Sequence, residues 1–392
     1  MTEQRATQDA VIIIGASAAG LFAAYLLAKG GVPVHLFDER ERLSPPARTL
    51  IVTNHIKDVL GYVPTSAIVN RTPNLQLFSP GRSTAICLRE PDWIVERQKL
   101  IQVLVDQARR AGVEILPGYR FQGLEPDVDG VLLHLESSTG CRTHLHTRTL
   151  IGAEGVFSQV AKATQQDGHS TVFSLQATVA MPPGARRDTT QVWFDPRSTR
   201  YFHWLIPESQ ERAAVGLVAD DEGQARESLQ RFLSMHNLEP LDYQGAAVPL
   251  YRRNGAPWKR VSGARICLVG DAAAQVKVTT VGGVVTSLRG ARTVAQAILR
   301  GVDYGRELGA LHRELELHLL VRKALNRFTA SDYDELLSLV NAPMKSALAA
   351  HTRDEIGHVL FPSLLAQPKL WLLAVRSFLR SGGLFWEGES QA

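Results

Sequence analysis

The alternation of apolar and polar segments is clearest at the amino-terminal end of the chain. It predicts a strand at 11–14, a Gly-rich turn at 15–20, a helix at 21–28 and a second strand at 34–37, which ends at Asp38. The first strand is a continuous β-branched run, and such runs are typical of strands that are covered on both faces. Strand, turn, helix and strand in this order indicate a parallel sheet with crossover helices.

Further along the chain the same kinds of pattern return. Apolar residues at helical spacing predict an amphipathic helix at 97–112, and a strand follows at 113–117. Short apolar runs at 149–151 and 266–269 predict two more strands, and the second of these leads into Asp271. A carboxylate at the end of a buried strand costs free energy unless it has polar partners. Asp271 is therefore a candidate for a binding role.

A pattern rich in aromatic residues occupies the middle of the chain. It predicts a hairpin at 74–88 around a Pro-Gly turn, and antiparallel strands at 191–195, 200–206 and 213–218. We expect these strands to form a second sheet. The region after residue 310 is mostly helical, with helices expected at 311–328, 332–340, 344–350 and 368–379.

Composition and charge exclude several classes of protein. The chain has 392 residues and a net charge of +4, and no run of Lys or Arg suggests nucleic acid as a partner. The polar N-terminus lacks the layout of a signal peptide, and no stretch reaches about 18 uncharged apolar residues. The three cysteines have no disulfide or metal-ligand spacing, so we expect a reducing, cytoplasmic compartment and no metal site.

The Gly-rich turn has the residues that a dinucleotide requires beside a strand. Gly15 permits a tight turn, the small Ser17 lets the backbone approach a pyrophosphate, and Gly20 lets helix and strand pack closely. The N–H groups at the start of the helix, including those of Ala18 and Ala19, can bind phosphates. Serine in place of the middle glycine is a small departure from the usual pattern.

Two acidic residues, Asp38 and Glu39, follow the second strand at the position where an acid accepts hydrogen bonds from ribose hydroxyls. Their negative charge would repel a 2′-phosphate, so NADP is not expected at this site. NAD(P)H or another electron donor is left open as a partner that would bind elsewhere.

Three motifs in order resemble the FAD motifs of the para-hydroxybenzoate hydroxylase-type flavoproteins. They are "GASAAG" together with Asp38, "GAEGVFS" at 152–158 and "GDAAAQV" at 270–276. Within that superfamily the third motif is similar to the geranylgeranyl reductase family, and so is "FHWLIPESQERAAVGLV" at 202–218. Val218 departs from the family, which has a glycine there. The matching residues of this segment are Phe202, Trp204, Ile206, Pro207 and Gly216.

The resemblance implies an α/β fold with a Rossmann-type FAD-binding domain, an inserted antiparallel-sheet substrate domain and a helical C-terminus. The FAD-binding domain is expected to be discontinuous, at 1–70, 95–165 and 260–310. The substrate-binding sheet domain is expected at 71–94 and 166–259, and the C-terminal helical region at 311–392.

The resemblance also implies how FAD is held. Asp271, after Gly270, would hydrogen-bond the ribityl chain, and a bond of this charged kind contributes about 1.5–3 kcal/mol. The backbone of Gly282 and Gly283 would lie beside the isoalloxazine ring. The helix that begins near Val284 would point its N-terminus at the flavin N1–C2=O region, where reduced flavin carries negative charge.

Further contacts come from the same resemblance. Arg48 and Arg97 stand where relatives have arginines that contact the cofactor. Thr49 stands where some members of the family carry a cysteine near the ring, so a role that needs a thiol is absent. Gly155 is an expected contact, whereas Glu154 replaces the usual aspartate of this motif.

The expected activity is that of an FAD-dependent oxidoreductase that transfers hydride to a carbon–carbon double bond of a hydrophobic, polyprenyl-like substrate, or the reverse desaturation. The alternative is a flavin-dependent monooxygenase or halogenase that acts through a flavin hydroperoxide. A third hypothesis is a non-catalytic flavoprotein that sequesters a lipid or passes electrons to a partner. No catalytic residue is identified, and His203 and His55 are candidates for the proton donor by residue type alone.

The expected partner is a small hydrophobic substrate that contacts Phe202, Trp204 and Pro207. The predicted helix at 368–379 has an apolar stripe broken by two arginines, which leaves two interpretations open. It packs on the core, or it rests on a membrane surface and makes the protein membrane-peripheral.

Overall fold

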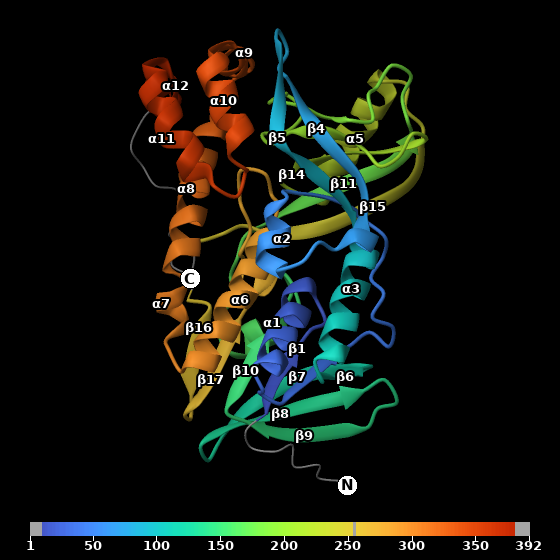
Figure 1. Ribbon diagram of the computed structural model, residues 1–392, viewed down its shortest axis with the longest axis vertical. Coiled ribbons are helices and arrows are strands. Elements are labelled where there is room, and N and C mark those ends of the chain that lie inside the picture. The colour runs from blue at the N-terminus through green and yellow to red at the C-terminus, as the bar shows by residue number, and fades with distance from the viewer. Residues whose placement is uncertain (1–9, 254–255, 381–392) are drawn as a thin grey trace.

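The computed structural model describes residues 10–253 and 256–380 (Figure 1). Within these ranges the chain forms three sheets, of six, eight and three strands, and a set of helices at the C-terminal end. Figure 1 shows the three-stranded sheet at one end of the molecule and the last helices at the opposite end.

The six-stranded sheet is the parallel sheet that the sequence predicts. Its order is β16-β17-β10-β1-β2-β6, and its neighbouring strands pair in parallel except for β16 and β17. The strands are β1 (Val11–Ile14), β2 (Val34–Asp38), β6 (Glu114–Pro117), β10 (Thr149–Gly152), β16 (Trp258–Val261) and β17 (Ala264–Leu268).

Both faces of this sheet are covered, as the β-branched run at its centre indicates. Val11 and Ile13 face a core shared with α1 (Ala18–Lys29), α3 (Arg97–Arg110) and α6 (Val284–Arg300). Ile12 and Ile14 face the three-stranded sheet of β7 (Tyr119–Asp127), β8 (Gly130–Ser137) and β9 (Arg142–Thr147). The sequence analysis did not anticipate the three-stranded sheet.

The eight-stranded sheet has the order β15-β11-β14-β13-β12-β4-β5-β3, and it confirms the predicted antiparallel layer. One face packs on α5 (Glu222–Met235), a helix that the sequence analysis missed. The other face has an apolar cluster around Trp204, Ile206 and Val218. The strands are β3 (Thr49–Val52), β4 (Ile68–Phe78), β5 (Ser83–Glu96), β11 (Thr171–Ala180), β12 (Thr189–Trp193), β13 (His203–Pro207), β14 (Arg212–Ala219) and β15 (Pro240–Pro249).

The helical C-terminal region is confirmed, with one helix more than predicted. The helices are α8 (Gly309–Leu325), α9 (Ala330–Leu339), α10 (Ala342–Ala350), α11 (Ile356–Ala366) and α12 (Pro368–Leu379). The extra helix is α11. The remaining short helices are α2 (His55–Leu60), α4 (Gln159–Ala163) and α7 (Tyr304–Glu307).

No single helix among residues 10–253 and 256–380 has the length and apolar content to cross a membrane. Helices α11 and α12 have the required length and apolar content only when they are taken together, and this pair is bent by 104°. The predicted domain boundaries stay a prediction. One feature bears on them: β3 and the start of β4 belong to the eight-stranded sheet, although they fall within the expected range 1–70.

Candidate dinucleotide site and the facing sheet

The carboxyl ends of β1, β10 and β17 bring the three predicted motifs together. The Ala153 N–H donates to the Ile14 carbonyl (2.7 Å), and the Val269 N–H donates to the Gly152 carbonyl (3.0 Å). A Cβ atom on Gly15 would lie 2.5 Å from the Ala153 carbonyl oxygen, which is closer than real Cβ atoms come. The first and second motifs therefore pack backbone against backbone, and glycine is required at the contact.

The start of α1 is equally tight. A Cβ atom on Gly20 would lie 2.1 Å from the Gly15 carbonyl oxygen, and a Cβ atom on Gly270 would lie 3.1 Å from the Ala19 Cβ. The Ser17 hydroxyl accepts the Gly20 N–H (3.2 Å) and caps the helix. Ser17 is therefore more than a small residue at this position. Its side chain stabilises the first turn of α1, which begins at Ala18.

Asp38 lies at the end of β2, as predicted, and Arg40 covers it. Its carboxylate accepts the Ala16 N–H (2.6 Å), the Arg40 N–H (3.0 Å) and two guanidinium hydrogen bonds from Arg40 (2.8 and 2.9 Å). Burial raises the pKa of Asp38, but the bonds from Arg40 and Ala16 outweigh burial and lower it. A carboxylate has about four acceptor positions, so a ribose hydroxyl would have to displace Arg40. The predicted ribose contact thus depends on a residue that the sequence analysis did not single out.

Asp271 lies beside the start of α6 and between two arginines. A Cβ atom on Gly283 would lie 3.3 Å from Asp271 Oδ1. Burial raises the pKa of Asp271, and the positive charges of Arg97 and Arg48 oppose this rise. Arg48 donates to the Ser174 hydroxyl of β11 (2.8 Å), and burial together with Arg97 lowers its pKa to about 10. The structure thus brings together four residues that the sequence analysis assigned to the cofactor.

The loop before α6 has the backbone strain that is common at functional sites. Val281, a β-branched residue, has a φ of +50°, and a residue in this region costs about 1–3 kcal/mol. Gly282 accepts the Lys277 N–H (3.3 Å), and Gly283 precedes the helix without a side-chain cap. The first N–H groups of α6, from Val284 on, therefore have no side-chain acceptor at the cap and suit an anionic ligand.

The second motif contains Gly155, which the sequence analysis expects to contact the cofactor, and Glu154, which has protein partners. Glu154 accepts hydrogen bonds from the Ser158 hydroxyl (2.5 Å) and the Gln159 N–H (3.0 Å), so it holds the start of α4. Burial raises the pKa of Glu154, against these bonds. Gly155 has a φ of +89° and open space where a Cβ would be, which leaves room for a ligand.

Two other predicted cofactor residues have protein partners in the structure. Glu39 is exposed and pairs with Arg120 (3.4 Å). Thr49 is buried in β3, and its hydroxyl donates to Glu208 of the neighbouring sheet segment. Neither contact involves the strand ends where the three motifs meet.

The face of the eight-stranded sheet that contains Trp204 is turned toward the Val281 loop. Trp204 is 8% exposed, its ring lies 5.9 Å from that of Phe202, and its indole N–H has no hydrogen-bond partner among the described residues. Val281 packs against this cluster, so the predicted flavin loop and the predicted substrate sheet meet there. Pro207 does not join the pair, because strand alternation places it with Leu205 on the opposite face.

The two histidines proposed as proton donors lie away from this junction. His203 is on the opposite face of the sheet, stacked on Phe232 with 4.6 Å between ring centroids. Burial lowers its pKa to about 4. His55 is in α2, where it contacts Thr352 (3.3 Å) and Glu355 (3.6 Å). The catalytic proton donor stays unidentified.

The sequence analysis missed a buried ion pair next to the third motif. Lys277 pairs with Asp354, and their side chains are 7% and 1% exposed. The one available signal was a lysine in the otherwise uncharged run after Asp271, because lysine is rarely buried unless it is paired.

The glycine contacts, the uncapped start of α6 and the paired charges around Asp271 fit a bound dinucleotide, and comparisons with known proteins identify which one. The sequence pattern of the FAD binding domain matches residues 8–303, so the chain belongs to the FAD-binding domain family. It is an FAD-dependent oxidoreductase, and FAD is the cofactor that the domain implies.

Two named relatives and one solved structure confirm the resemblance to geranylgeranyl reductases. Digeranylgeranylglycerophospholipid reductase 1 of Methanothermobacter thermautotrophicus is 27% identical over 364 residues, which cover 84% of this chain and 90% of the relative. Geranylgeranyl diphosphate reductase of Synechocystis is 24% identical over 321 residues (76% and 77%). A geranylgeranyl bacteriochlorophyll reductase-like structure from Thermoplasma acidophilum shares the fold with a TM-score of 0.77 at 17% identity, over 94% of this chain and 98% of that one.

Proposed function

We propose that this oxidoreductase transfers hydride between its flavin and a carbon–carbon double bond of a hydrophobic, polyprenyl-type substrate. The observation that carries the proposal is the contact between the Val281 loop and the apolar sheet face around Trp204. A ligand held on that face would contact the Val281 loop. The next residues of this loop, Gly282 and Gly283, are those expected to lie beside the isoalloxazine ring. Relatives at 27% and 24% identity are named for the reduction of geranylgeranyl groups, which supports the same substrate class.

In this proposal the chain supplies position and charge, and the bound FAD supplies the redox chemistry. The backbone at Gly15, Ser17, Gly20 and Gly155 would receive the pyrophosphate side of the cofactor. A separate electron donor, NAD(P)H or a protein, would bind elsewhere than at the Gly-rich turn after β1.

Asp271 would hydrogen-bond the ribityl chain, and the positive charges of Arg48 and Arg97 would oppose the rise in its pKa that burial causes. The uncapped N-terminus of α6, at Gly283 and Val284, would stabilise negative charge on the reduced ring.

The direct test is anaerobic. The holoprotein is reduced with dithionite and mixed with geranylgeranyl diphosphate or with digeranylgeranylglycerophospholipid, and flavin oxidation and product mass are followed. The proposal predicts flavin oxidation together with a product that has gained two hydrogen atoms per double bond reduced. A product that contains oxygen or halide in the presence of O₂ would establish the alternative, and the absence of any product from both substrates would favour a non-catalytic flavoprotein.

Trp204 offers a more specific test of the substrate face. Trp204→Phe removes the partnerless indole N–H and keeps an aromatic ring of similar shape. We expect the KM for the prenyl substrate to rise while flavin content stays the same. Trp193→Phe is the matched control, because Trp193 packs against Phe78 and Phe232 on the other side of the sheet.

We also propose that helices α11 and α12 rest on a lipid surface. Trp371, Leu372 and Leu379 of α12 are 54%, 68% and 76% exposed, and Leu365 of α11 is 84% exposed. Exposed apolar side chains of this density mark an interaction surface. Sedimentation with phospholipid vesicles tests this, with Trp371→Glu/Leu372→Glu expected to stay in solution. Equal sedimentation of this variant and the native protein would contradict the proposal.

A further inference from the structure

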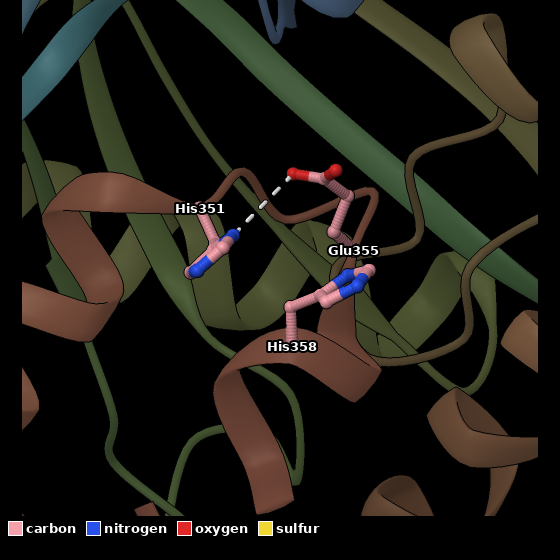
Figure 2. A group of neighbouring side chains, drawn as sticks. All are labelled: His351, Glu355 and His358. Atoms are coloured by element: carbon pink, nitrogen blue, oxygen red, sulfur yellow. Dashed lines mark ion pairs between the residues drawn. The ribbon is translucent and has the colours of Figure 1, made fainter. Parts of the chain in front are cut away.

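We propose that His351, Glu355 and His358 bind a divalent transition-metal ion of the zinc class, a site that is independent of the flavin. Figure 2 shows the three side chains as neighbours, from the end of α10 and the start of α11, with His351 directed at the Glu355 carboxylate. One ligand atom from each residue can be chosen so that all lie within 4.8 Å of one another. The sequence analysis expected no metal site, because the cysteines lack metal-ligand spacing, and it did not single out these three residues.

The geometry is close to what a metal requires. Zinc binds imidazole nitrogen at about 2.0–2.1 Å, so two ligands of a tetrahedral ion lie about 3.3 Å apart. His351 Nδ1 is already 3.9 Å from Glu355 Oε2, and the rings of His351 and His358 stack with 5.4 Å between centroids. His351 and Glu355 are 38% and 32% exposed, which leaves freedom for the small rotations that closure needs. Glu355 makes no side-chain cap to α11, and its Oε2 accepts the Thr352 N–H (3.4 Å), which leaves Oε1 for a cation.

A cavity leaves one side of the site open. Its volume is about 430 Å³, and Glu355, His358 and His55 are among its lining residues. His55 Nε2 lies 3.6 Å from Glu355 Oε2, so His55 is a fourth candidate ligand. Two histidines and a carboxylate with one open position form the donor set that zinc uses when a further ligand binds. Arg289 and Arg292 also line the cavity, together with the carboxylates of Asp58, Glu314 and Asp354.

The position of the site suggests that a bound ion would stabilise the attachment of the C-terminal helices to the rest of the chain. Between the metal ligands His351 and Glu355 lie Arg353, which pairs with Asp92 of β5, and Asp354, which pairs with Lys277 near the flavin loop. A bound ion would fix the backbone on both sides of these two ion pairs. We therefore expect metal binding to raise the unfolding temperature of the C-terminal helices.

The test uses the full-length, untagged holoprotein after dialysis against EDTA. Co²⁺ is added first, because its visible spectrum reports tetrahedral coordination, and Zn²⁺ is then used to compete. We expect one ion per chain. His358→Gln and His351→Gln should each weaken binding by at least about tenfold, since loss of an outer-shell partner alone typically costs 10–100-fold. His55→Gln should weaken binding if His55 is the fourth ligand.

Two controls keep the test decisive. His236→Gln removes an exposed histidine elsewhere and should leave binding unchanged. His134 and His144, whose Nδ1 atoms are 2.7 Å apart on the three-stranded sheet, form a competing imidazole pair. Binding that is lost in His144→Gln and kept in His351→Gln/His358→Gln would overturn the proposal, as would the absence of one-to-one binding in the native protein. Flavin content is measured for each variant to confirm that the fold is intact.

Discussion

Lys277 and Asp354 form a buried ion pair although they are 77 positions apart in the sequence. The Thr53 hydroxyl also donates to Asp354, so the end of β3, the segment after the third FAD motif and the loop between α10 and α11 meet at one carboxylate. Burial raises the pKa of Asp354, but Lys277 and Thr53 outweigh it and lower the pKa to about 2. The C-terminal helices are thereby attached to the loop that leads to α6.

Asp354→Asn should destabilise the protein by about 3–5 kcal/mol, because it leaves the Lys277 ammonium buried without its counter-charge. Urea unfolding at pH 7 measures this. Glu222→Gln, which breaks an exposed pair with Arg226, is the control and should cost less than about 1 kcal/mol. The double variant Lys277→Met/Asp354→Asn should recover part of the loss. If the double variant is less stable than both single variants, the pair is not the source of the effect.

Gly15→Ala should abolish FAD binding and lower stability. The added methyl group would lie 2.5 Å from the Ala153 carbonyl, and a φ of +105° is strained for any residue with a side chain. Flavin absorbance of the purified protein and its melting temperature report the two effects. Gly123→Ala is the matched control, since a Cβ there meets nothing within 4 Å and should leave flavin content unchanged.

Asp271→Ala should weaken FAD binding by about 10–150-fold, which corresponds to the 1.5–3 kcal/mol of one charged hydrogen bond. Titration of the apoprotein with FAD, followed by flavin fluorescence, gives the affinity. Asp106→Ala, on the outer side of α3, should bind FAD as the native protein does. Equal affinity of the Asp271 variant and the native protein would remove Asp271 from the cofactor site.

The stability of the protein should fall between pH 6.5 and about 4 because of His203. Burial lowers the pKa of His203 from 6.5 to about 4, so in this range the unfolded chain binds a proton that the folded chain does not. By linkage, stability decreases as the pH falls through this window, by on the order of 3 kcal/mol.

Unfolding free energies at pH 7 and pH 4.5 check this expectation. His203→Gln keeps a partner for the Ser198 hydroxyl, which lies 3.2 Å from the imidazole, and should show a smaller loss. His144→Gln, an exposed control, should show the native loss. If both variants lose as much stability between pH 7 and pH 4.5 as the native protein does, the effect belongs to other groups. One such group is His318, whose pKa is lowered by burial to about 3.

The parallel sheet and the three motifs could be predicted because their signals are local. The β-branched run at 11–14, the glycines of the turn and the acid at Asp38 each stand next to the element that needs them. The aromatic strands after residue 190 could also be predicted, because alternating apolar and polar residues and the turn residues between the strands define them.

What could not be predicted depends on contacts between distant segments. The partner of Lys277 lies 77 positions away, and no residue near Asp354 in the sequence indicates that its carboxylate is buried. Arg40 could have been noticed, because it is two residues after Asp38, but its side-chain direction is a property of the folded turn. Pro207 was assigned to the substrate face from a resemblance to a motif, and the alternation of β13 places it on the other side.

The pairing order of the parallel sheet has a consequence for how the protein is made. β10 lies between β1 and β17, and it ends at Gly152 whereas β17 begins at Ala264, so a ribosome must translate about 110 further residues before β10 has its second neighbour. At bacterial and eukaryotic elongation speeds this takes on the order of ten seconds or more. During that time the edge of β10 is an open template for intermolecular pairing. We therefore expect chaperone occupancy of the nascent chain to affect the yield of this protein in a heterologous host.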